Sequence, residues 1–481
     1  MKEFEFGFSR RAINPPMKMG LAGYFNTRIW EKVLDDLEVR VAAFRSGSQQ
    51  ALLIQYDLIA CPPEMFQLLK KQLKKAGFGD MVLLVTATHC HTAPEVRRGR
   101  GGFEADYLPF AVEQTLKAVR DAVADLTAGT LEQGVGLEFR CSFNRRFWMK
   151  DGTVQSNPGK LNPGIIRPEG EIDPEIPLLK FSGAAGKTLL LCSICNHADT
   201  TGGNDVSGDW PGWCRRLVEK KLGAGTMVMP LIGCSGDLNH FDVTVPGMQT
   251  DPAEAKRIGH AYATAVICGL NSLKPAEPEF SCRSSAFEMP GREIFPDELA
   301  EANAVMEKYA DLEFSQETAR NLTAEDFAAK KPVVLKYFAQ TLLERANHPK
   351  VFQFEVSLLD FGCGAVIGLP AEPFVACGLT IRKQFCFGKT ALIAILNNGS
   401  GTGYLPNAWN YGRGGYETTP RSNQFSVHAS EIVQHVTALL LKEDTCGTCV
   451  SPLRCTLMFG NAMRDHLEGF QAGIKSREKQ G

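Results

Sequence analysis

Short runs of apolar residues alternate along the chain with longer stretches in which apolar residues recur every three or four positions. The short runs predict buried strands, and the longer stretches predict amphipathic helices. In the first part of the chain, the predicted strands are residues 51–58, 81–87, 188–194 and 227–232. The predicted helices are residues 64–75, 107–126, 213–221 and 252–270. Strands that alternate with helices in this way indicate an α/β fold.

The second part of the chain adds a helical segment and then returns to strands. Two stretches rich in Ala, Glu, Leu and Lys predict helices at residues 296–309 and 323–347. Further strands are predicted at residues 352–360, 364–367 and 391–396. A loop rich in Gly, Asn and Tyr follows at residues 397–421, and a last helix is predicted at residues 426–441.

This succession of elements predicts the domain organisation. We expect one large mixed α/β domain over residues 1–445, with a helical insertion at about residues 290–350 and a short C-terminal tail at residues 446–481. The predicted strands of the first part each run into a polar loop that carries His or Asp. Sites in open α/β sheets lie at the carboxyl ends of strands, so we expect these strands to end in metal-binding loops.

The charge balance excludes some classes of partner. The chain has 52 Lys and Arg residues against 54 Asp and Glu residues, a formal net charge of -2. Neither nucleic acid nor an anionic membrane therefore has an electrostatic reason to bind. No apolar run reaches the about 20 residues of a membrane span, and residues 1–6 lack the apolar core of a secretory signal. We expect a cytoplasmic protein that acts on a small molecule, and the sequence leaves its oligomeric state open.

The chain contains 15 cysteines. In a cytoplasmic protein these are expected to be reduced thiols rather than disulfides. The one tight pair is Cys446 with Cys449. A single pair of this spacing fits a metal or redox role, and it also fits an ordinary C-terminal segment.

Three of the nine histidines directly follow predicted strands. His89 and His91 follow the strand at residues 81–87, and His197 follows the strand at residues 188–194. Imidazole is a common zinc ligand, and two rings spaced as His-x-His on an extended segment point to one side. The pattern therefore favours a metal site; the alternative is two polar loops with incidental histidines.

A carboxylate and two tyrosines follow the later strands. Glu372 lies between the strand at residues 364–367 and a Pro-flanked turn. In that place it serves either as a carboxylate metal ligand or as an N-terminal cap of the next helix. Tyr404 and Tyr416 bracket a Gly-rich stretch whose backbone can pass close to a ligand.

Four motifs in this order resemble the catalytic domain of the neutral/alkaline ceramidases, zinc amidases that hydrolyse an N-acyl bond. The resemblance spans roughly residues 5–445, as separate motifs rather than as continuous similarity. The motifs are residues 88–94, residues 196–198 with 207–209, residues 370–372, and residues 403–404 with 416–417. The chain is thus identified as a divergent member of this family.

The resemblance implies a role for individual residues. The positions that match the zinc ligands of the family are His89, His197, Glu372 and Tyr404, which would hold one zinc ion per chain. The positions that match the residues around the reacting water and carbonyl are His91, Arg145 and Tyr416. In this mechanism His91 moves a proton, while Arg145 and Tyr416 stabilise the developing oxyanion. Arg145 or its neighbour Arg146 can instead pair a surface acid.

One position departs from the family pattern. The family carries a Ser that has been proposed as a nucleophile or substrate contact, and Asn239 stands at that position here. An amide side chain is a very poor nucleophile but offers both a hydrogen-bond donor and an acceptor. We therefore expect Asn239 to contact substrate, and the reaction to depend on metal-activated water. Asp209 either orients His197 or caps the helix that begins near Pro211.

These features predict a zinc-dependent hydrolase that cleaves an amide or related acyl bond. A membrane-lipid enzyme needs an apolar or basic surface helix to reach its substrate, and neither terminus shows one. We therefore expect a small soluble N-acyl compound, such as an acylated amino sugar or amino acid, rather than ceramide. Two other functions stay open: a binding protein on a ceramidase-like scaffold, and a zinc-assisted lyase that acts on a sugar-like substrate.

Overall fold

The structure is a computed structural model of the 481-residue chain. It describes residues 3–24, 26–315, 322, 326, 329–347, 350–386, 388–420 and 422–442. Cys446, Cys449 and the rest of the expected tail lie outside these residues.

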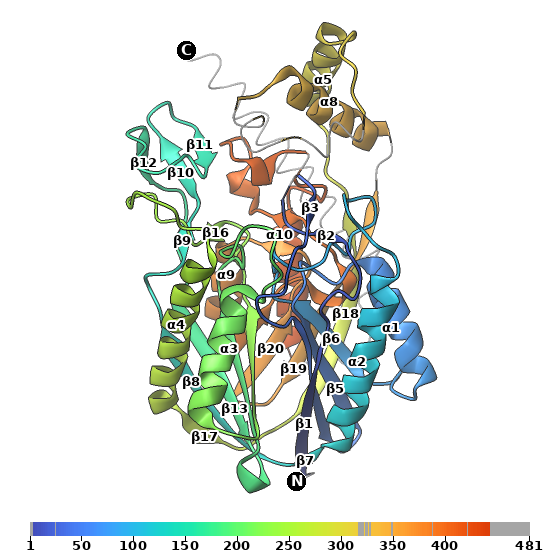
Figure 1. The fold of residues 1–481 in the computed structure, drawn as a ribbon, viewed down its shortest axis with the longest axis vertical. Helices are drawn as coiled ribbons and strands as arrows, with labels where there is room; N and C mark the ends of the chain where they lie inside the picture. Colours follow the sequence, from blue (N-terminus) through green and yellow to red (C-terminus); the bar gives the residue numbers. More distant parts are fainter. Residues whose placement is uncertain are drawn as a thin grey trace.

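Three large sheets form the framework (Figure 1). The first has the order β6-β5-β4-β1-β7, the second β15-β14-β13-β8-β17 and the third β18-β19-β20-β22. The strands of the first sheet are β1 (Phe4–Ala12), β4 (Glu38–Ser46), β5 (Gln49–Tyr56), β6 (Val82–Ala87) and β7 (Thr127–Ala128). Those of the second are β8 (Thr130–Leu137), β13 (Glu175–Ser182), β14 (Thr188–Ile194), β15 (Thr226–Ile232) and β17 (Lys274–Ala276). Those of the third are β18 (Ser281–Pro290), β19 (Val351–Asp360), β20 (Gly364–Gly368) and β22 (Thr390–Ala394).

Helices cover the outer faces of these sheets (Figure 1). Helix α2 (Tyr107–Ala124) packs on β1 and β4, and α1 (Pro63–Lys75) lies beside it. Helices α3 (Asp209–Leu222) and α4 (Pro252–Gly269) pack on each other and on the second sheet. Helix α10 (Ala429–Leu441) packs on β18 and β19 and against α9 (Val375–Phe385). The predicted mixed α/β fold is confirmed.

Both faces of the central strands are buried, which explains their nearly continuous apolar sequences. Along β5, Leu52 and Ile54 belong to the core on the helix side, whereas Leu53 belongs to the core between the sheets. The core between the sheets is rich in phenylalanine, with Phe44 at its centre. The Phe44 ring lies 5.1 Å from that of Phe361.

This aromatic core gives a prediction about stability. Phe44 is fully buried, so Phe44→Ala leaves a cavity and should lower the free energy of unfolding by about 3–5 kcal/mol. Phe139 is 59% exposed, and the matched control Phe139→Ala should change it by less than about 0.5 kcal/mol. Denaturant unfolding of both variants measures the difference. Similar losses in the two variants would argue against the described packing.

The helical segment is inserted between β18 and β19, two neighbouring strands of the third sheet. Pro290 at the end of β18 pairs directly with Val351 at the start of β19. Between them lie α5 (Pro296–Lys308) and α8 (Pro332–Asn347), which pack on each other through a small apolar cluster of their own. Figure 1 shows this pair at the end of the molecule opposite the N-terminus.

The sequence located most central elements but misplaced several ends. Strand β14 has the predicted bounds. The predicted strand at residues 391–396 ends at Ala394, because Leu396 has a left-handed backbone with φ 65°. Helix α3 begins at Asp209, four positions before its predicted start. Strands such as β8 and β18 were not predicted, because many of their residues are polar and exposed.

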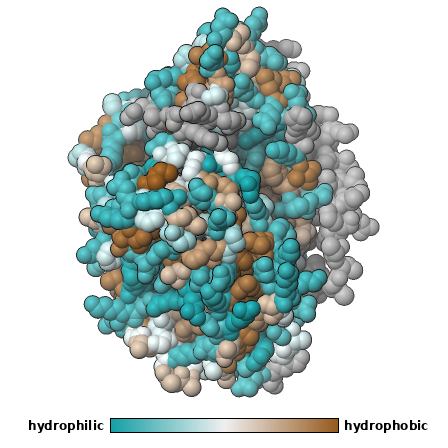
Figure 2. All heavy atoms as spheres, turned by 45° about the vertical axis from the view of Figure 1, so that its right-hand side comes forward, coloured by the Kyte–Doolittle hydropathy of each residue, from teal (hydrophilic) through white to brown (hydrophobic). Residues whose placement is uncertain are grey.

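No helix within the described residues has both the length and the apolar character needed to cross a membrane. Figure 2 shows one face of the molecule, where hydrophobic side chains lie in small groups between hydrophilic ones.

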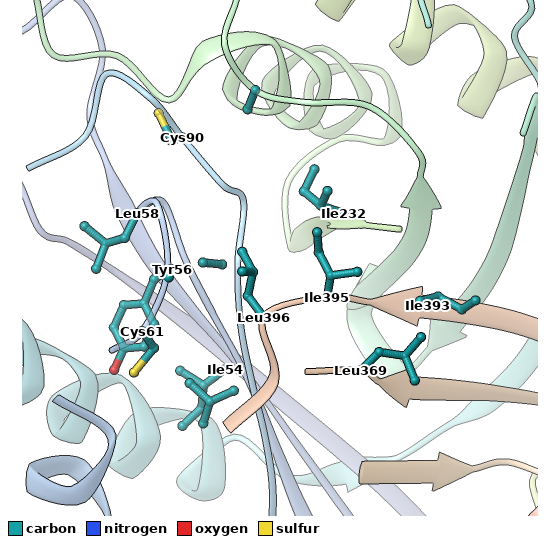
Figure 3. Close-up of a cluster of buried hydrophobic side chains, with 14 of the residues drawn as sticks. Ile54, Tyr56, Leu58, Cys61, Cys90, Ile232, Leu369, Ile393, Ile395 and Leu396 are labelled. Carbon is teal, nitrogen blue, oxygen red and sulfur yellow. The ribbon is translucent and has the colours of Figure 1, made fainter. Parts of the chain in front are cut away.

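Each large sheet has a parallel pair at one edge: β5 with β6, β14 with β15, and β20 with β22. These three edges meet. The Ile395 amide donates to the Ile232 carbonyl at 2.9 Å, and the Thr86 hydroxyl donates to the Ile395 carbonyl at 2.7 Å. Figure 3 shows the buried side chains at this junction, including Ile232, Leu369, Ile395 and Leu396. The loops that follow β6, β14 and β20 therefore come together from three sheets.

Candidate metal centre

Three of the predicted ligands converge where the sheet edges meet. His89 follows β6, His197 follows β14 and Glu372 follows β20. The Nε2 atom of His89 lies 3.3 Å from Oε2 of Glu372, and Nε2 of His197 lies 3.9 Å from the same oxygen. All three side chains are buried. The predicted strand-end cluster is thus present in the structure.

The donor atoms of this cluster lack partners in the protein. Nε2 of His197 and Oε2 of Glu372 are buried without a hydrogen bond. His89 is held through Nδ1, 2.9 Å from the Ile59 carbonyl oxygen. Since Nδ1 contacts this carbonyl, Nε2 is the ring nitrogen that faces Glu372. Buried polar atoms without partners are costly, and this donor set of imidazoles and a carboxylate fits a zinc ion.

The backbone at this centre is locally strained. His89 has φ 55° and Ala371 has φ 54°, both in the left-handed region. Such conformations cost about 1–3 kcal/mol each in residues other than glycine and cluster at functional sites. They turn the chain sharply after β6 and β20. The strain therefore aims His89 and Glu372 into the cluster.

A short parallel ribbon brings Tyr404 next to Glu372. Strand β21 (Glu372–Pro373) pairs with β23 (Tyr404–Leu405), with Glu372 directly opposite Tyr404. The Gly403 amide donates to Oε1 of Glu372 at 2.9 Å, which leaves Oε2 for the cluster. Helix α9 begins three residues later with Phe374 at its N-cap position. The capping alternative for Glu372 is therefore wrong.

Burial sets the protonation states of the cluster. Burial lowers the pKa of His197 and of His91 well below the ordinary value, which keeps both rings in the neutral form that binds metals. Burial alone would raise the pKa of Glu372. Contacts with His89, the Gly403 amide and Arg145 outweigh that effect and lower it to about 2. Glu372 is therefore ionised at neutral pH.

His91 lies at the edge of the same cluster. Nitrogen atoms of His89, His91 and His197 lie within 4.8 Å of one another, close enough to hold a metal ion together. Both ring nitrogens of His91 lack a hydrogen-bond partner. Two ligand sets therefore share His89 and His197: one adds His91, and the other adds Glu372.

Arg145 lies between the two predicted tyrosines. Its guanidinium is 5.1 Å from the ring centre of Tyr404 and 5.2 Å from that of Tyr416. The two hydroxyl oxygens are 3.5 Å apart. Burial raises the pKa of both phenols, so each keeps its proton at neutral pH and can donate a hydrogen bond. The three groups form a compact cationic and donor-rich wall.

Glu417 holds this wall in place and was given no role from the sequence. It is fully buried, and it accepts from Arg145 Nε at 3.0 Å and from Arg146 at 2.8 Å. Arg145 also donates to the Gly236 carbonyl at 2.6 Å. The idea that either arginine pairs a surface acid is wrong, because their shared partner is buried. The position of Glu417 directly after Tyr416 was the available signal.

Comparison with solved structures identifies the fold. A crystal structure of neutral ceramidase from Pseudomonas aeruginosa aligns with a TM-score of 0.66 over 95% of this chain and 78% of that chain, at 16% sequence identity. A structure described as ceramidase complexed with C2 aligns with a TM-score of 0.66 over 94% of this chain and 78% of that chain, also at 16% identity. The chain has the neutral ceramidase fold. No protein-family model and no curated protein sequence matches it.

Within this ceramidase fold, Asn239 lies opposite Phe143, two positions before Arg145, and is already engaged. Strand β16 (Leu238–Asn239) pairs with β9 (Phe143–Asn144), the strand that leads into Arg145. The Asn239 amide donates to Oδ1 of Asn157 at 2.7 Å, and its own oxygen accepts from the Phe241 amide at 3.1 Å. One side-chain N–H of Asn239 is left for another partner.

Asp209 supports the loop that carries His197. As the first residue of α3, it accepts from the backbone amides of Thr200 at 2.9 Å and Thr201 at 2.7 Å. The next residue, Trp210, donates from its indole to the His197 carbonyl at 2.7 Å. Asp209 thus fixes the course of the loop after β14 rather than the His197 ring itself.

Proposed function

We propose that this protein is a zinc-dependent hydrolase related to the neutral ceramidases, which cleaves an amide bond, or a related acyl bond, of a small soluble substrate. One observation carries the proposal: His89, His197 and Glu372 converge from three sheets, and Nε2 of His197 and Oε2 of Glu372 are buried without a hydrogen bond. The likeness of the whole fold to neutral ceramidase structures supports the same chemistry. A shared fold does not establish a shared function, so the proposal depends on the residues of the site.

In the proposal, His89, His197, Glu372 and Tyr404 hold one zinc ion per chain. A zinc ion held by these residues would supply a water nucleophile at neutral pH and a Lewis acid for the acyl carbonyl. Tyr404 qualifies as the fourth ligand because it pairs in register with Glu372. Its phenol is more acidic on a metal than in the buried protein, where its pKa is raised.

The remaining residues handle protons and charge. His91 takes a proton from the attacking water through a ring nitrogen and passes it to the departing nitrogen as the C–N bond breaks. The products are a carboxylic acid and an amine, and His91 returns to its starting state. Arg145 and Tyr416 donate toward the carbonyl oxygen as negative charge develops on it. Their fixed positions around Glu417 mean that little reorganisation is needed.

The substrate class rests on the polar character of the surrounding loops. The hydroxyls of Thr200, Thr201 and Ser235, in the loops after β14 and β15, are buried and lack hydrogen-bond partners. Such groups favour a ligand that can hydrogen-bond, such as an N-acyl amino sugar or N-acyl amino acid. The twelve cysteines in the described residues are all free, which supports action in the cytoplasm.

A substrate panel tests this proposal. N-acyl amino acids, N-acyl amino sugars and a long-chain ceramide are incubated with native, chelator-treated and zinc-restored protein. We expect hydrolysis of a small N-acyl compound, lost on chelation and restored by zinc. In ¹⁸O-labelled water the label should enter the carboxylate product, an outcome that excludes a lyase. Activity that survives verified metal removal contradicts the mechanism, and efficient ceramide turnover contradicts the substrate class. Tight binding without turnover of any compound indicates a binding protein.

We also propose that Asn239 contacts substrate through its free side-chain N–H. Asn239→Ala should reduce kcat/KM by roughly ten- to a hundredfold, which corresponds to about 1–3 kcal/mol for a lost hydrogen bond to substrate. Steady-state kinetics on the best substrate of the panel measures the change. Asn204→Ala is the matched control because Asn204 is exposed and donates only to Glu31 among the described contacts. An unchanged kcat/KM in Asn239→Ala would remove Asn239 from the substrate site.

A further inference from the structure

Asp199 lies beside the ring of His91. Its Oδ1 atom is 3.5 Å from Nδ1 of His91, and the hydroxyl of Tyr24 donates to the same oxygen at 2.6 Å. The side chains of His91 and Asp199 are 12% and 22% exposed, so solvent only partly screens this contact. A separation of 3.5 Å is long for a hydrogen bond, and such contacts at ligand-free sites shorten when substrate binds.

A segment near the N-terminus also packs against the His91 ring. Gly23 has φ 96°, and a Cβ atom at this position would lie 2.4 Å from Nδ1 of His91. The Tyr24 ring meets the His91 ring edge-on, with centroids 6.0 Å apart. Only glycine leaves room for the ring at this point. The chain around Gly23 and Tyr24 thus forms one wall of the His91 position.

Arg28 joins this wall to the backbone of His91. Its guanidinium lies 4.0 Å from the Tyr24 ring centre, and it donates to the His91 carbonyl at 2.6 Å. The His91 amide in turn donates to the Ala198 carbonyl at 3.0 Å, directly before Asp199. Each of these neighbours of His91 is therefore fixed by another, and the carboxylate of Asp199 lies 3.5 Å from Nδ1 of its ring.

We infer that Asp199, held by Tyr24, is a positioning residue for His91: its carboxylate accepts the Nδ1–H of the ring and directs Nε2 toward the reacting group. The inference rests on the proposed hydrolase function. A carboxylate behind an imidazole fixes one tautomer and stabilises the ring when it carries an extra proton. With the Nδ1 proton fixed, Nε2 receives the proton from water and returns it to the leaving nitrogen as the C–N bond breaks. These proton transfers involve only the substrate, one water molecule and His91.

Two substrates with the same acyl group test the inference. An amide must receive a proton on its leaving nitrogen, whereas a 4-nitrophenyl ester releases a stable phenolate without one. In Asp199→Asn, the one remaining acceptor oxygen carries no charge and must serve both Tyr24 and His91, which weakens the preference for the Nδ1–H tautomer. We expect kcat for the amide to fall by about 10- to 100-fold. The ester should show a smaller fall because it needs His91 only as the base, and the metal content should be unchanged. Tyr24→Phe should show a smaller loss with the same selectivity.

The control is Asp205→Asn, because Asp205 makes a surface contact with Lys32 at 3.6 Å; it should leave both rates unchanged. Equal losses on amide and ester, no loss on either, or loss of metal from Asp199→Asn would overturn the inference. The ¹⁵N shifts of the His91 ring, assigned with a His91→Gln sample, give an answer that needs no turnover. They should report an Nδ1–H tautomer that changes in Asp199→Asn, and an unchanged tautomer contradicts the inference. A wild type that cleaves neither substrate contradicts the proposed function instead, and the shifts still decide the role of Asp199.

Discussion

Replacing Glu372 with Gln is expected to remove the metal and with it the activity. The carboxylate is buried and ionised, and its Oε2 atom lies 3.3 and 3.9 Å from Nε2 of His89 and of His197. A neutral amide has nearly the same shape but lacks the charge that offsets a divalent cation. Since a metal contributes several kcal/mol to the transition state, the rate should fall on the order of a thousandfold or more.

Metal content and rate should be measured on the same preparations of Glu372→Gln. The matched control is Glu288→Gln, since Glu288 is exposed on β18 and contacts Gln353. We expect the control to keep full metal content and full activity, and the folded state of both variants can be compared by circular dichroism. A folded Glu372→Gln protein with full metal content would show that the ion is held without the Glu372 carboxylate.

Replacing His91 with Gln should slow turnover on the order of 100- to 10,000-fold, the range for a lost general acid and base. The metal content should not change, because His91 is proposed to move protons rather than to bind the ion. This separation is informative because nitrogen atoms of His91, His89 and His197 lie within 4.8 Å of one another. His260→Gln is the control, since His260 is exposed on α4. Loss of metal from His91→Gln would instead make His91 a ligand.

The strands β5, β6, β14 and β15 were predictable because they are apolar over most of their length, whereas the central strands β1, β4 and β13 were missed because charged residues interrupt them. The apolar runs in β5, β6, β14 and β15 stand out against polar flanks, and their ends are sharp. Strands with one exposed face or with polar sequences gave no comparable signal. The pairing of Pro290 with Val351 also depends on contacts over sixty positions apart in the chain, which local periodicity does not encode.

The cluster of His89, His197 and Glu372 was predictable because each residue follows a strand. Parallel strands at sheet edges bring their carboxyl ends together, so position after a strand predicts proximity. The roles of these residues as zinc ligands stay predictions. Glu417 and Asp199 show what the sequence did not supply, since their partners Arg145 and Tyr24 lie 272 and 175 positions away. Apart from the position of Glu417 directly after Tyr416, nothing local distinguishes these acids from ordinary surface carboxylates.

The central claim is that this chain holds one zinc ion at the junction of its three sheets. Elemental analysis of native protein, purified without added metal or chelator, tests it most directly when combined with the Glu372→Gln variant. We expect about one equivalent of zinc per wild-type chain and far less in Glu372→Gln. Wild-type protein that is folded and free of metal, and that takes up none from a zinc-containing buffer, would contradict it.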